Sequence, residues 1–227
     1  MSADFSIPED LLTTLESTAD EPASDEVTLE LYFIYDSHCP WSYAATPLVN
    51  VISEAFPEMK INLMHCAHFN GTDSAGQEQV DAVLKLSAVK FSKEHIRYVN
   101  SPKNAIKTAN LMAWMQSKQP NKLLPVLNAL QKAHFIDGNP LDCKHDFNNI
   151  VEQFKLSPSN KVFKDELSSD AEFVLGDITE IQELIETTAF PVMLVMANDQ
   201  GIFIDHSQYL GQPLEVVEFL KREMKSL

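Results

Sequence analysis

The clearest chemistry in this sequence belongs to a cysteine placed where a strand-like run meets the start of a helix. The apolar run Leu31–Tyr35 leads through residues 36–38 into Cys39-Pro40-Trp41-Ser42. Proline suits the first helical position, because its φ is helical and its missing N–H is not needed there. Cys39 is therefore the expected N-cap, with its sulfur over unpaired N–H groups at the positive end of the helix dipole. That field favours the thiolate, which is the reactive form of cysteine.

Ser42 stands three residues after Cys39, on the same face of the predicted helix. Its hydroxyl can hydrogen-bond a thiolate, but a serine cannot resolve a mixed disulfide. An oxidant or isomerase that uses an internal disulfide between these two positions is therefore excluded by atom type. The alternative interpretation of the same segment is an inert cysteine buried at a helix start.

A second polar segment, His65-Cys66-Ala67-His68, follows the next strand-like run. Cys66 is a candidate resolving thiol if its Cα lies within roughly 7 Å of that of Cys39. Together with His38, this segment supplies nitrogen and sulfur ligands of the kind that Zn²⁺ prefers. The spacing lacks a Cys-x-x-Cys pair, so no metal is predicted and zinc stays an alternative.

The other ionisable candidates are weaker. Asp36 follows the apolar run and is either a proton relay or, as we expect, a solvated turn aspartate. Cys143 is expected at a helix start or in packing. The histidines outside the two segments pair with no nucleophile and are expected at the surface or with satisfied hydrogen bonds. They are His95, His134, His145 and His206.

The formal net charge of −16, from 33 acidic and 17 basic residues, argues against nucleic acid and anionic membranes as partners. Eight of the acidic residues lie within residues 1–26, which indicates an acidic arm with a short helix over 7–15. No stretch is apolar enough for a membrane span, and the start lacks a secretory signal. Three cysteines are too few for a disulfide framework, so free thiols in the cytoplasm are expected.

Periodicity predicts an α/β fold. Residues 27–36 and 59–65 are expected as parallel strands joined by a helix over 40–56. A long region of helical periodicity follows, and strands over 192–197 and 202–205 with a helix over 214–224 close the chain. We therefore expect an arm (1–26), a sheet domain (27–70 plus 186–227) and a helical insertion domain (71–185).

Three separate features together resemble the thioredoxin fold in its DsbA-family form. They are the Cys39-Pro-Trp-Ser motif, the helical insertion with Leu130–Gly138, and Thr188-Ala-Phe-Pro191 before the last strands. The resemblance covers residues 28–226 and includes the FrnE-like and 2-hydroxychromene-2-carboxylate isomerase branches. It implies a cis proline at Pro191 beside the thiol. The motif Cys-Pro-Trp-Ser-Tyr is also similar to the Ser-Pro-Tyr-Ser-Trp of kappa-class glutathione transferases.

The resemblance implies a thiol–disulfide oxidoreductase, or protein disulfide isomerase-like protein, with a monothiol mechanism. Cys39 and Ser42 would be catalytic. The expected substrate-binding residues are His38, Pro40, Trp41, Phe190 and Pro191. Glutathione is expected as co-substrate and a disulfide-containing protein or glutathione as partner, with no tightly bound cofactor. Alternatives are a kappa-like glutathione transferase or isomerase, a non-catalytic protein-binding module, and a pseudo-enzyme that has lost its second cysteine.

Overall fold

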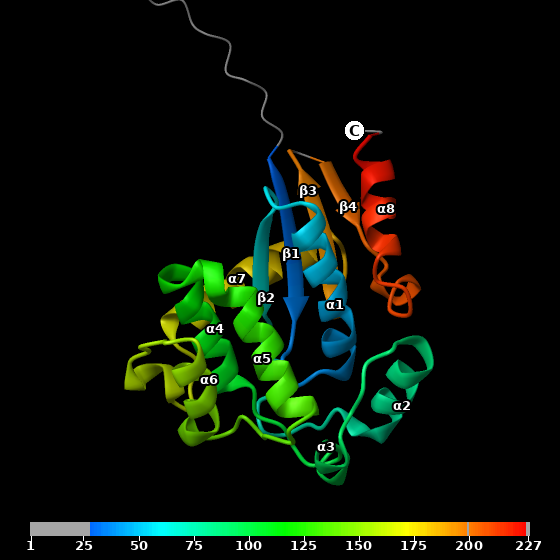
Figure 1. Cartoon of the computed structure of the whole chain (residues 1–227). Helices are drawn as coiled ribbons and strands as arrows, with labels where there is room; N and C mark the ends of the chain where they lie inside the picture. Colours follow the sequence, from blue (N-terminus) through cyan, green and yellow to red (C-terminus); the bar gives the residue numbers. More distant parts are fainter. Residues whose placement is uncertain (1–27, 199, 226–227) are drawn as a thin grey trace, which may run out of the picture.

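The computed structural model describes residues 28–198 and 200–225, and these form a four-stranded sheet flanked by helices (Figure 1). The predicted acidic arm and its short helix lie outside the described residues. The strands of the sheet are β1 (Leu29–Tyr35), β2 (Lys60–His65), β3 (Val192–Ala197) and β4 (Gln200–Phe203).

The predicted βαβ unit is confirmed. Strands β1 and β2 run parallel, with Leu31 opposite Ile61 and Tyr35 opposite His65, and α1 (Pro40–Ala55) connects them. Because the strands are parallel, the segments that leave their carboxyl ends lie at the same edge of the sheet. The residues after Tyr35 and after His65 therefore share one end of the molecule.

The strand order is β2-β1-β3-β4, with β3 antiparallel to both β1 and β4. The last strand lies two residues earlier than predicted, since Gln200 pairs with Ala197 and Phe203 with Leu194. The local reason lies in Asp205, whose carboxylate accepts a hydrogen bond from the Ser207 N–H at 3.2 Å. This interaction caps a 3₁₀ turn, so the chain leaves the strand before Asp205.

Six α-helices lie in the chain between β2 and β3, where the sequence predicted helical periodicity. They are α2 (Gly76–Leu86), α3 (Lys93–Arg97), α4 (Ile106–Lys118), α5 (Leu123–Phe135), α6 (Asn148–Gln153) and α7 (Ser169–Leu184). The predicted closing helix is α8 (Glu215–Glu223). Short 3₁₀ helices are η2 (Pro120–Lys122), η3 (Lys144–Phe147), η4 (Asn160–Phe163) and η5 (His206–Gln208).

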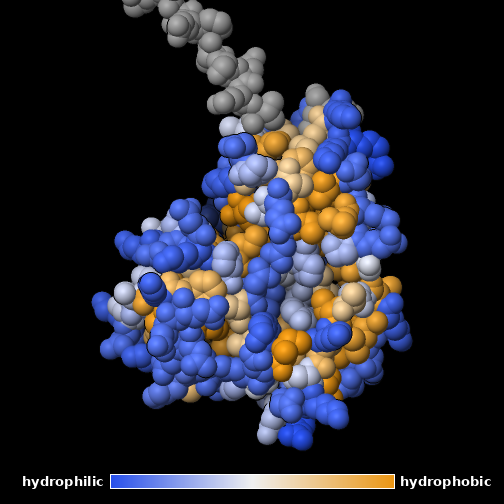
Figure 2. Space-filling view, in the orientation of Figure 1, coloured by the Kyte–Doolittle hydropathy of each residue, from blue (hydrophilic) through white to orange (hydrophobic). Residues whose placement is uncertain are grey.

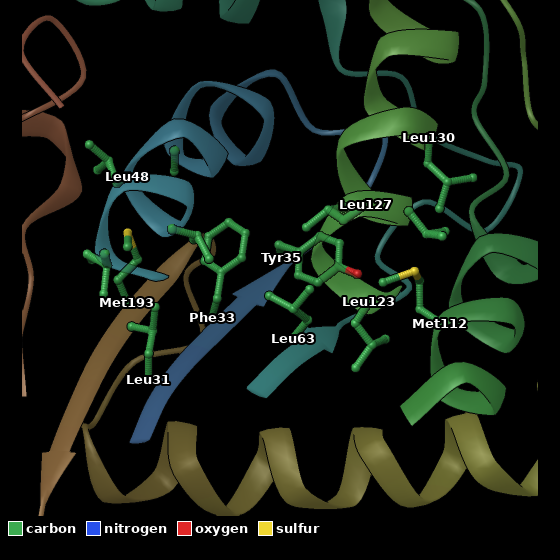
Figure 3. Packing of buried hydrophobic residues seen from close by; sticks show 14 of the residues in the cluster. Leu31, Phe33, Tyr35, Leu48, Leu63, Met112, Leu123, Leu127, Leu130 and Met193 are labelled. Atoms are coloured by element: carbon green, nitrogen blue, oxygen red, sulfur yellow. The ribbon is translucent and has the colours of Figure 1, made fainter. Parts of the chain in front are cut away.

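Strand β1 is buried on both faces, as its apolar run indicated. Phe33 and Tyr35 pack with Leu48 of α1 and Leu127 of α5, and Figure 3 shows these side chains together on one side of the sheet. Ile34 points to the opposite face and packs in the cluster that contains α7, which Figure 3 shows on that side. Helices therefore fix both faces of β1, and with them the position of the turn that follows it.

The molecular surface is mixed in character. On the face shown in Figure 2, hydrophobic patches are interrupted by hydrophilic residues. Within residues 28–198 and 200–225, none of the helices combines the length with the apolar character that crossing a bilayer would take.

Candidate active site

Cys39 lies at the N-terminus of α1, as predicted. Its backbone is extended (φ −85°, ψ 122°), Pro40 occupies the first helical position, and the Tyr43 N–H donates to the Cys39 carbonyl oxygen at 3.0 Å. The Cys39 N–H donates to the Asp36 carbonyl oxygen at 3.1 Å, which closes the turn between β1 and α1. The sequence folds this way because the strand ends at Asp36 and proline can only start the following helix.

The Cys39 side chain lies at a cavity of about 530 Å³ at this end of the sheet. The thiol packs with Phe69, Ala75 and Ala105, and only 3% of the residue is exposed. Residues from three places in the sequence line the cavity: the start of α1, the region from the loop after β2 into α2, and the segment before β3. They are Cys39, Trp41, His68, Phe69, Asp73, Ser74, Gln79, Thr188, Ala189 and Phe190.

The prediction that Cys39 is a thiolate is wrong for this structure, because the thiol is buried. Burial raises the pKa of the Cys39 thiol to about 11, and the nearby Asp36 carboxylate also raises it. Hydrogen bonds from Ser42 and from the backbone of Trp41 lower that pKa without offsetting the loss of solvation. The sequence could not show this, because the residues that cover the sulfur lie 30 or more positions away, at Phe69, Ala75 and Ala105.

Ser42 is buried and directed at the thiol, as predicted. Its hydroxyl oxygen accepts a hydrogen bond from the Asp36 N–H at 3.2 Å. Its side chain and its backbone also hydrogen-bond Cys39 and favour the thiolate form. Ser42 thus supplies two of the groups that stabilise negative charge on the sulfur.

Asp36 is fully buried, so the expectation of a solvated turn aspartate is wrong. Its Oδ1 accepts from the His38 N–H at 2.8 Å and its Oδ2 from the Phe69 N–H at 3.1 Å. Burial raises the pKa of this carboxyl to about 6, although the backbone hydrogen bonds lower it. The chain after β2 folds over the carboxylate, and the residues next to Asp36 in the sequence give no sign of this contact.

His38 does not line the cavity, and its predicted contact with substrate is wrong. The residue is fully buried, with Nδ1 3.0 Å from the Ser37 hydroxyl and Nε2 2.9 Å from the Pro140 carbonyl oxygen. Burial lowers the pKa of His38 to about 4, so the ring is neutral near pH 7. Both nitrogens are engaged by the protein itself.

Of the remaining predicted substrate-binding residues, Trp41 and Phe190 line the cavity and are only partly buried. Pro40 and Pro191 are buried and do not line it. A direct contact of either proline ring with a molecule in the cavity is therefore not available in this structure. The Phe190–Pro191 peptide bond is cis, the form that the resemblance implied.

Cys66 is partly buried and packs in the cluster with Ile34 and Met64. Burial raises the pKa of its thiol well above the usual range, and the charges of Asp36 and Cys39 raise that pKa too. The resolving role of Cys66 stays a prediction. All three cysteines are free, and the exposed Cys143 caps η3. In the described part of the chain, no group of three or more His, Cys, Asp or Glu side chains is placed to hold a metal ion.

The polar rim of the cavity was not predicted from the sequence. Asp73 and Ser74 come from a loop predicted only as a connection, and Gln79 comes from the first turn of α2. The one sequence feature that could have predicted these residues is the position of the loop directly after the second parallel strand. Ligand sites of α/β sheets lie at the carboxyl ends of the strands.

The sheet, the cysteine at the start of α1, the cis Phe190–Pro191 bond and the helices inserted between β2 and β3 define a thioredoxin-like fold of the DsbA type. Solved structures share it. Cytosolic disulfide reductase DsbM from Pseudomonas aeruginosa, solved with GSH, superposes with a TM-score of 0.74 and 16% identity, covering 86% of this chain and 99% of its own. A proposed protein disulfide isomerase from Nitrosomonas europaea gives 0.68 and 15%, covering 88% and 98%.

The likeness lies in the fold, at identities too low to carry function by themselves. No protein-family model matches the sequence, and no curated protein matches it significantly.

Proposed function

We propose that this protein is a thiol–disulfide oxidoreductase in which Cys39 acts alone as the nucleophile and glutathione completes the cycle. The observation that carries the proposal is the Cys39 side chain at the wall of a cavity, with hydrogen bonds from Ser42 and the Trp41 backbone aimed at the sulfur. Groups that favour a thiolate at the start of a helix are what nucleophilic cysteines require.

The exchange has two steps. The Cys39 thiolate attacks one sulfur of a mixed disulfide between a protein and glutathione, the S–S bond breaks, and the protein thiolate leaves. A glutathione thiolate then attacks the Cys39–glutathione disulfide and releases oxidised glutathione. Over the two steps, one free glutathione thiol is oxidised, the protein half of the mixed disulfide is released as a thiol, the two glutathione sulfurs end in oxidised glutathione, and Cys39 returns to its starting state. Release by an external thiol is required because the Ser42 hydroxyl cannot attack the Cys39–glutathione disulfide.

The proton of Cys39 needs an acceptor, because burial holds the thiol pKa at about 11. Asp36 is a carboxyl of pKa about 6 whose charge acts on Cys39, so near pH 7 it is mostly ionised. We assign Asp36 the role of receiving the thiol proton as attack begins, which removes the repulsion between the two negative charges.

Three features support glutathione as the small thiol. The cavity of about 530 Å³ falls within the range of small-ligand sites. Its polar rim, with Asp73, Gln79 and Thr188, offers hydrogen bonds to a peptide. The similar protein DsbM is described as a cytosolic disulfide reductase and was solved with GSH. We propose that this protein is also cytoplasmic, because its three cysteines are free and a reducing cytoplasm keeps thiols reduced.

Turnover tests the proposal. A glutathionylated peptide is supplied with glutathione, and oxidised glutathione is followed with a glutathione reductase and its nicotinamide cofactor. Cys39→Ser should abolish catalysis, whereas Cys143→Ser, which removes an exposed thiol outside the cavity, should leave the rate unchanged. Full turnover in Cys39→Ser would overturn the proposal.

One observation favours a second candidate, a kappa-like glutathione transferase or isomerase. A thiol of pKa about 11 is protonated near pH 7, and a protonated Cys39 beside the Ser42 hydroxyl can donate hydrogen bonds to the thiolate of bound glutathione. In that case glutathione, and not Cys39, attacks the substrate. Transfer of glutathione to an electrophilic aromatic substrate that survives Cys39→Ser would select this candidate over disulfide exchange.

A further inference from the structure

A second cavity, of about 750 Å³, lies where α3, the chain over 98–104 and the end of α5 meet. It shares no lining residue with the cavity at Cys39. Three of its lining side chains are ionisable and almost completely buried: His95 is 4% exposed, His134 is 3% and Lys103 is 7%. Nothing in the proposed disulfide exchange uses these three residues.

The two imidazole rings each leave one nitrogen without a partner. The Nδ1 of His134 is 2.9 Å from the Asn139 carbonyl oxygen, so it carries the hydrogen. His95 likewise donates a ring hydrogen to the backbone of His134. The Nε2 atoms of both rings are buried and have no hydrogen-bond partner. Buried polar atoms without partners cost free energy, and a cluster of them beside a cavity points to a missing ligand.

Lys103 sets the sign of that ligand. Its ammonium donates to the carbonyl oxygens of Tyr98 and Ser101, which leaves one of its three hydrogens free. Among the described residues, no carboxylate forms an ion pair with it. Asp142 is an exposed lining residue, Glu94 packs against Gly138, and the backbone carbonyl of Asp73 accepts from the Lys103 backbone N–H. The neutral, buried ring of His38 faces that of His134, with 4.3 Å between centroids. A cationic ligand would meet an uncompensated buried ammonium.

We propose that this cavity binds a small molecule through an oxyanion group, held by the Lys103 ammonium and by the Nε2 atoms of His95 and His134, which take up protons as the anion binds. In the neutral rings these Nε2 atoms are acceptors, and only protonation converts them into donors to an anion. The anion supplies the negative charge that offsets Lys103 and both imidazolium ions. Carboxylate and phosphate-like groups share this chemistry.

Calorimetric titration of the full chain with sulfate tests the proposal, because sulfate keeps the same charge between pH 6 and 8. Ionic strength is held constant with sodium chloride, and the titration is repeated in buffers of different ionisation enthalpy. We expect binding with net proton uptake, and a Kd that increases about tenfold per pH unit for each proton taken up. Acetate in place of sulfate distinguishes a carboxylate site from a tetrahedral dianion site.

The variants are Lys103→Met, His95→Gln and His134→Gln, compared with His145→Asn, which removes an exposed histidine outside the cavity. Each of the first three should weaken sulfate at least about tenfold, and each histidine variant should lose one proton of uptake. His145→Asn should bind as the unchanged protein does. Absence of heat with both anions, binding without proton uptake, or equal affinity in Lys103→Met would overturn the proposal.

A variant that has unfolded would also fail to bind sulfate. A second measurement therefore uses the unchanged protein. The ring ¹⁵N resonances of its histidines are followed by NMR while sulfate is added. The Nε2 signals of His95 and His134 should move from the unprotonated to the protonated range, while those of His145 stay. A shift confined to His145, or no shift at all, contradicts the proposal without any substitution.

Discussion

The hydroxyl oxygen of Ser42 accepts a hydrogen bond from the backbone N–H of Asp36 at 3.2 Å. This bond ties the first turn of α1 to the end of β1 and uses the oxygen as an acceptor, so the hydroxyl hydrogen is left for the Cys39 sulfur. The position that holds a second cysteine in dithiol relatives is therefore an orienting and charge-stabilising group here.

Ser42→Ala should raise the thiol pKa of Cys39 and slow its reaction with a disulfide near pH 7 by about tenfold, because one hydrogen bond to the thiolate is lost. The measurement is the rate of thiol release from an aromatic disulfide, in protein that also carries Cys66→Ser and Cys143→Ser. Ser53→Ala, on the same helix but away from the sulfur, is the matched control. Equal rates in both variants would remove Ser42 from the site.

Trp41→Ala should expose the sulfur. Trp41 is a partly buried ring that packs against the cluster containing Cys39. Its removal admits water, which lowers the thiol pKa from about 11 and speeds alkylation by iodoacetamide about tenfold per unit of pKa change at neutral pH.

Trp114→Ala provides the comparison for this prediction, because both tryptophans are partly buried against the main core but only Trp41 also packs against the cluster containing Cys39. It should cost stability and leave the alkylation rate of Cys39 unchanged. If both tryptophan variants accelerate alkylation equally, the effect comes from general loosening and not from the cover over Cys39.

The sequence predicted the scaffold well, for identifiable reasons. The run Leu31–Tyr35 is apolar because both faces of β1 are covered, and Pro40 has no helical role except at the first turn. Cys39 at the N-cap follows directly from those two facts. The burial of Cys39 and Asp36 depends instead on Phe69 and Ala105, which approach through the fold and leave no local pattern.

The histidines show the same limit. His38 was predicted to bind substrate because it precedes Cys39, yet its ring hydrogen-bonds the Pro140 carbonyl, 102 residues along the chain. His95 and His134 lacked any nearby nucleophile in the sequence, and only the fold brings their rings to 5.0 Å between centroids. Sequence neighbours predicted strands and caps, but not which polar side chains the helices would bury.

Asp36→Asn should change how stability depends on pH. Burial raises the Asp36 pKa from 3.8 to about 6, so the folded state holds this proton more tightly than the unfolded state does. The resulting stabilisation is full below about pH 4 and is lost as the pH rises through 6. Relative to Asp36→Asn, the unchanged protein should lose about 3 kcal/mol of unfolding free energy between pH 4 and 7.

Urea unfolding at several pH values measures that difference. Asp81→Asn, on the exposed side of α2, should give a curve parallel to that of the unchanged protein. A parallel curve for Asp36→Asn as well would mean that the Asp36 carboxylate is solvated after all.

The buried histidines act in the opposite direction. Burial lowers the pKa of His38 and His95 to about 4, that of His65 to about 3, and that of His134 well below its usual value. The unfolded chain protonates these rings below about pH 6.5 while the folded protein keeps them neutral, so stability falls on acidification. Near pH 5 to 6, each of the four histidines lowers the free energy of unfolding by about 1.4 kcal/mol per pH unit of acidification, and Asp36 raises it by about as much. The expected net loss is up to about 4 kcal/mol per pH unit.

Chemical denaturation between pH 7 and 5 checks this slope. His38→Asn should reduce it by about 1.4 kcal/mol per pH unit, the contribution of one proton. His145→Asn, at an exposed site, should leave the slope unchanged. A stability that does not vary over this pH range would contradict the burial of neutral rings.

The nucleophilic role of Cys39 is tested most directly by mass spectrometry of the intact protein after incubation with oxidised glutathione. Two single-cysteine proteins are compared, one that keeps only the buried Cys39 and one that keeps only the exposed Cys143. We expect one glutathione adduct on the Cys39 protein, formed faster than on the Cys143 protein and removed by added glutathione. An unmodified Cys39 protein under conditions that modify Cys143 would contradict this expectation.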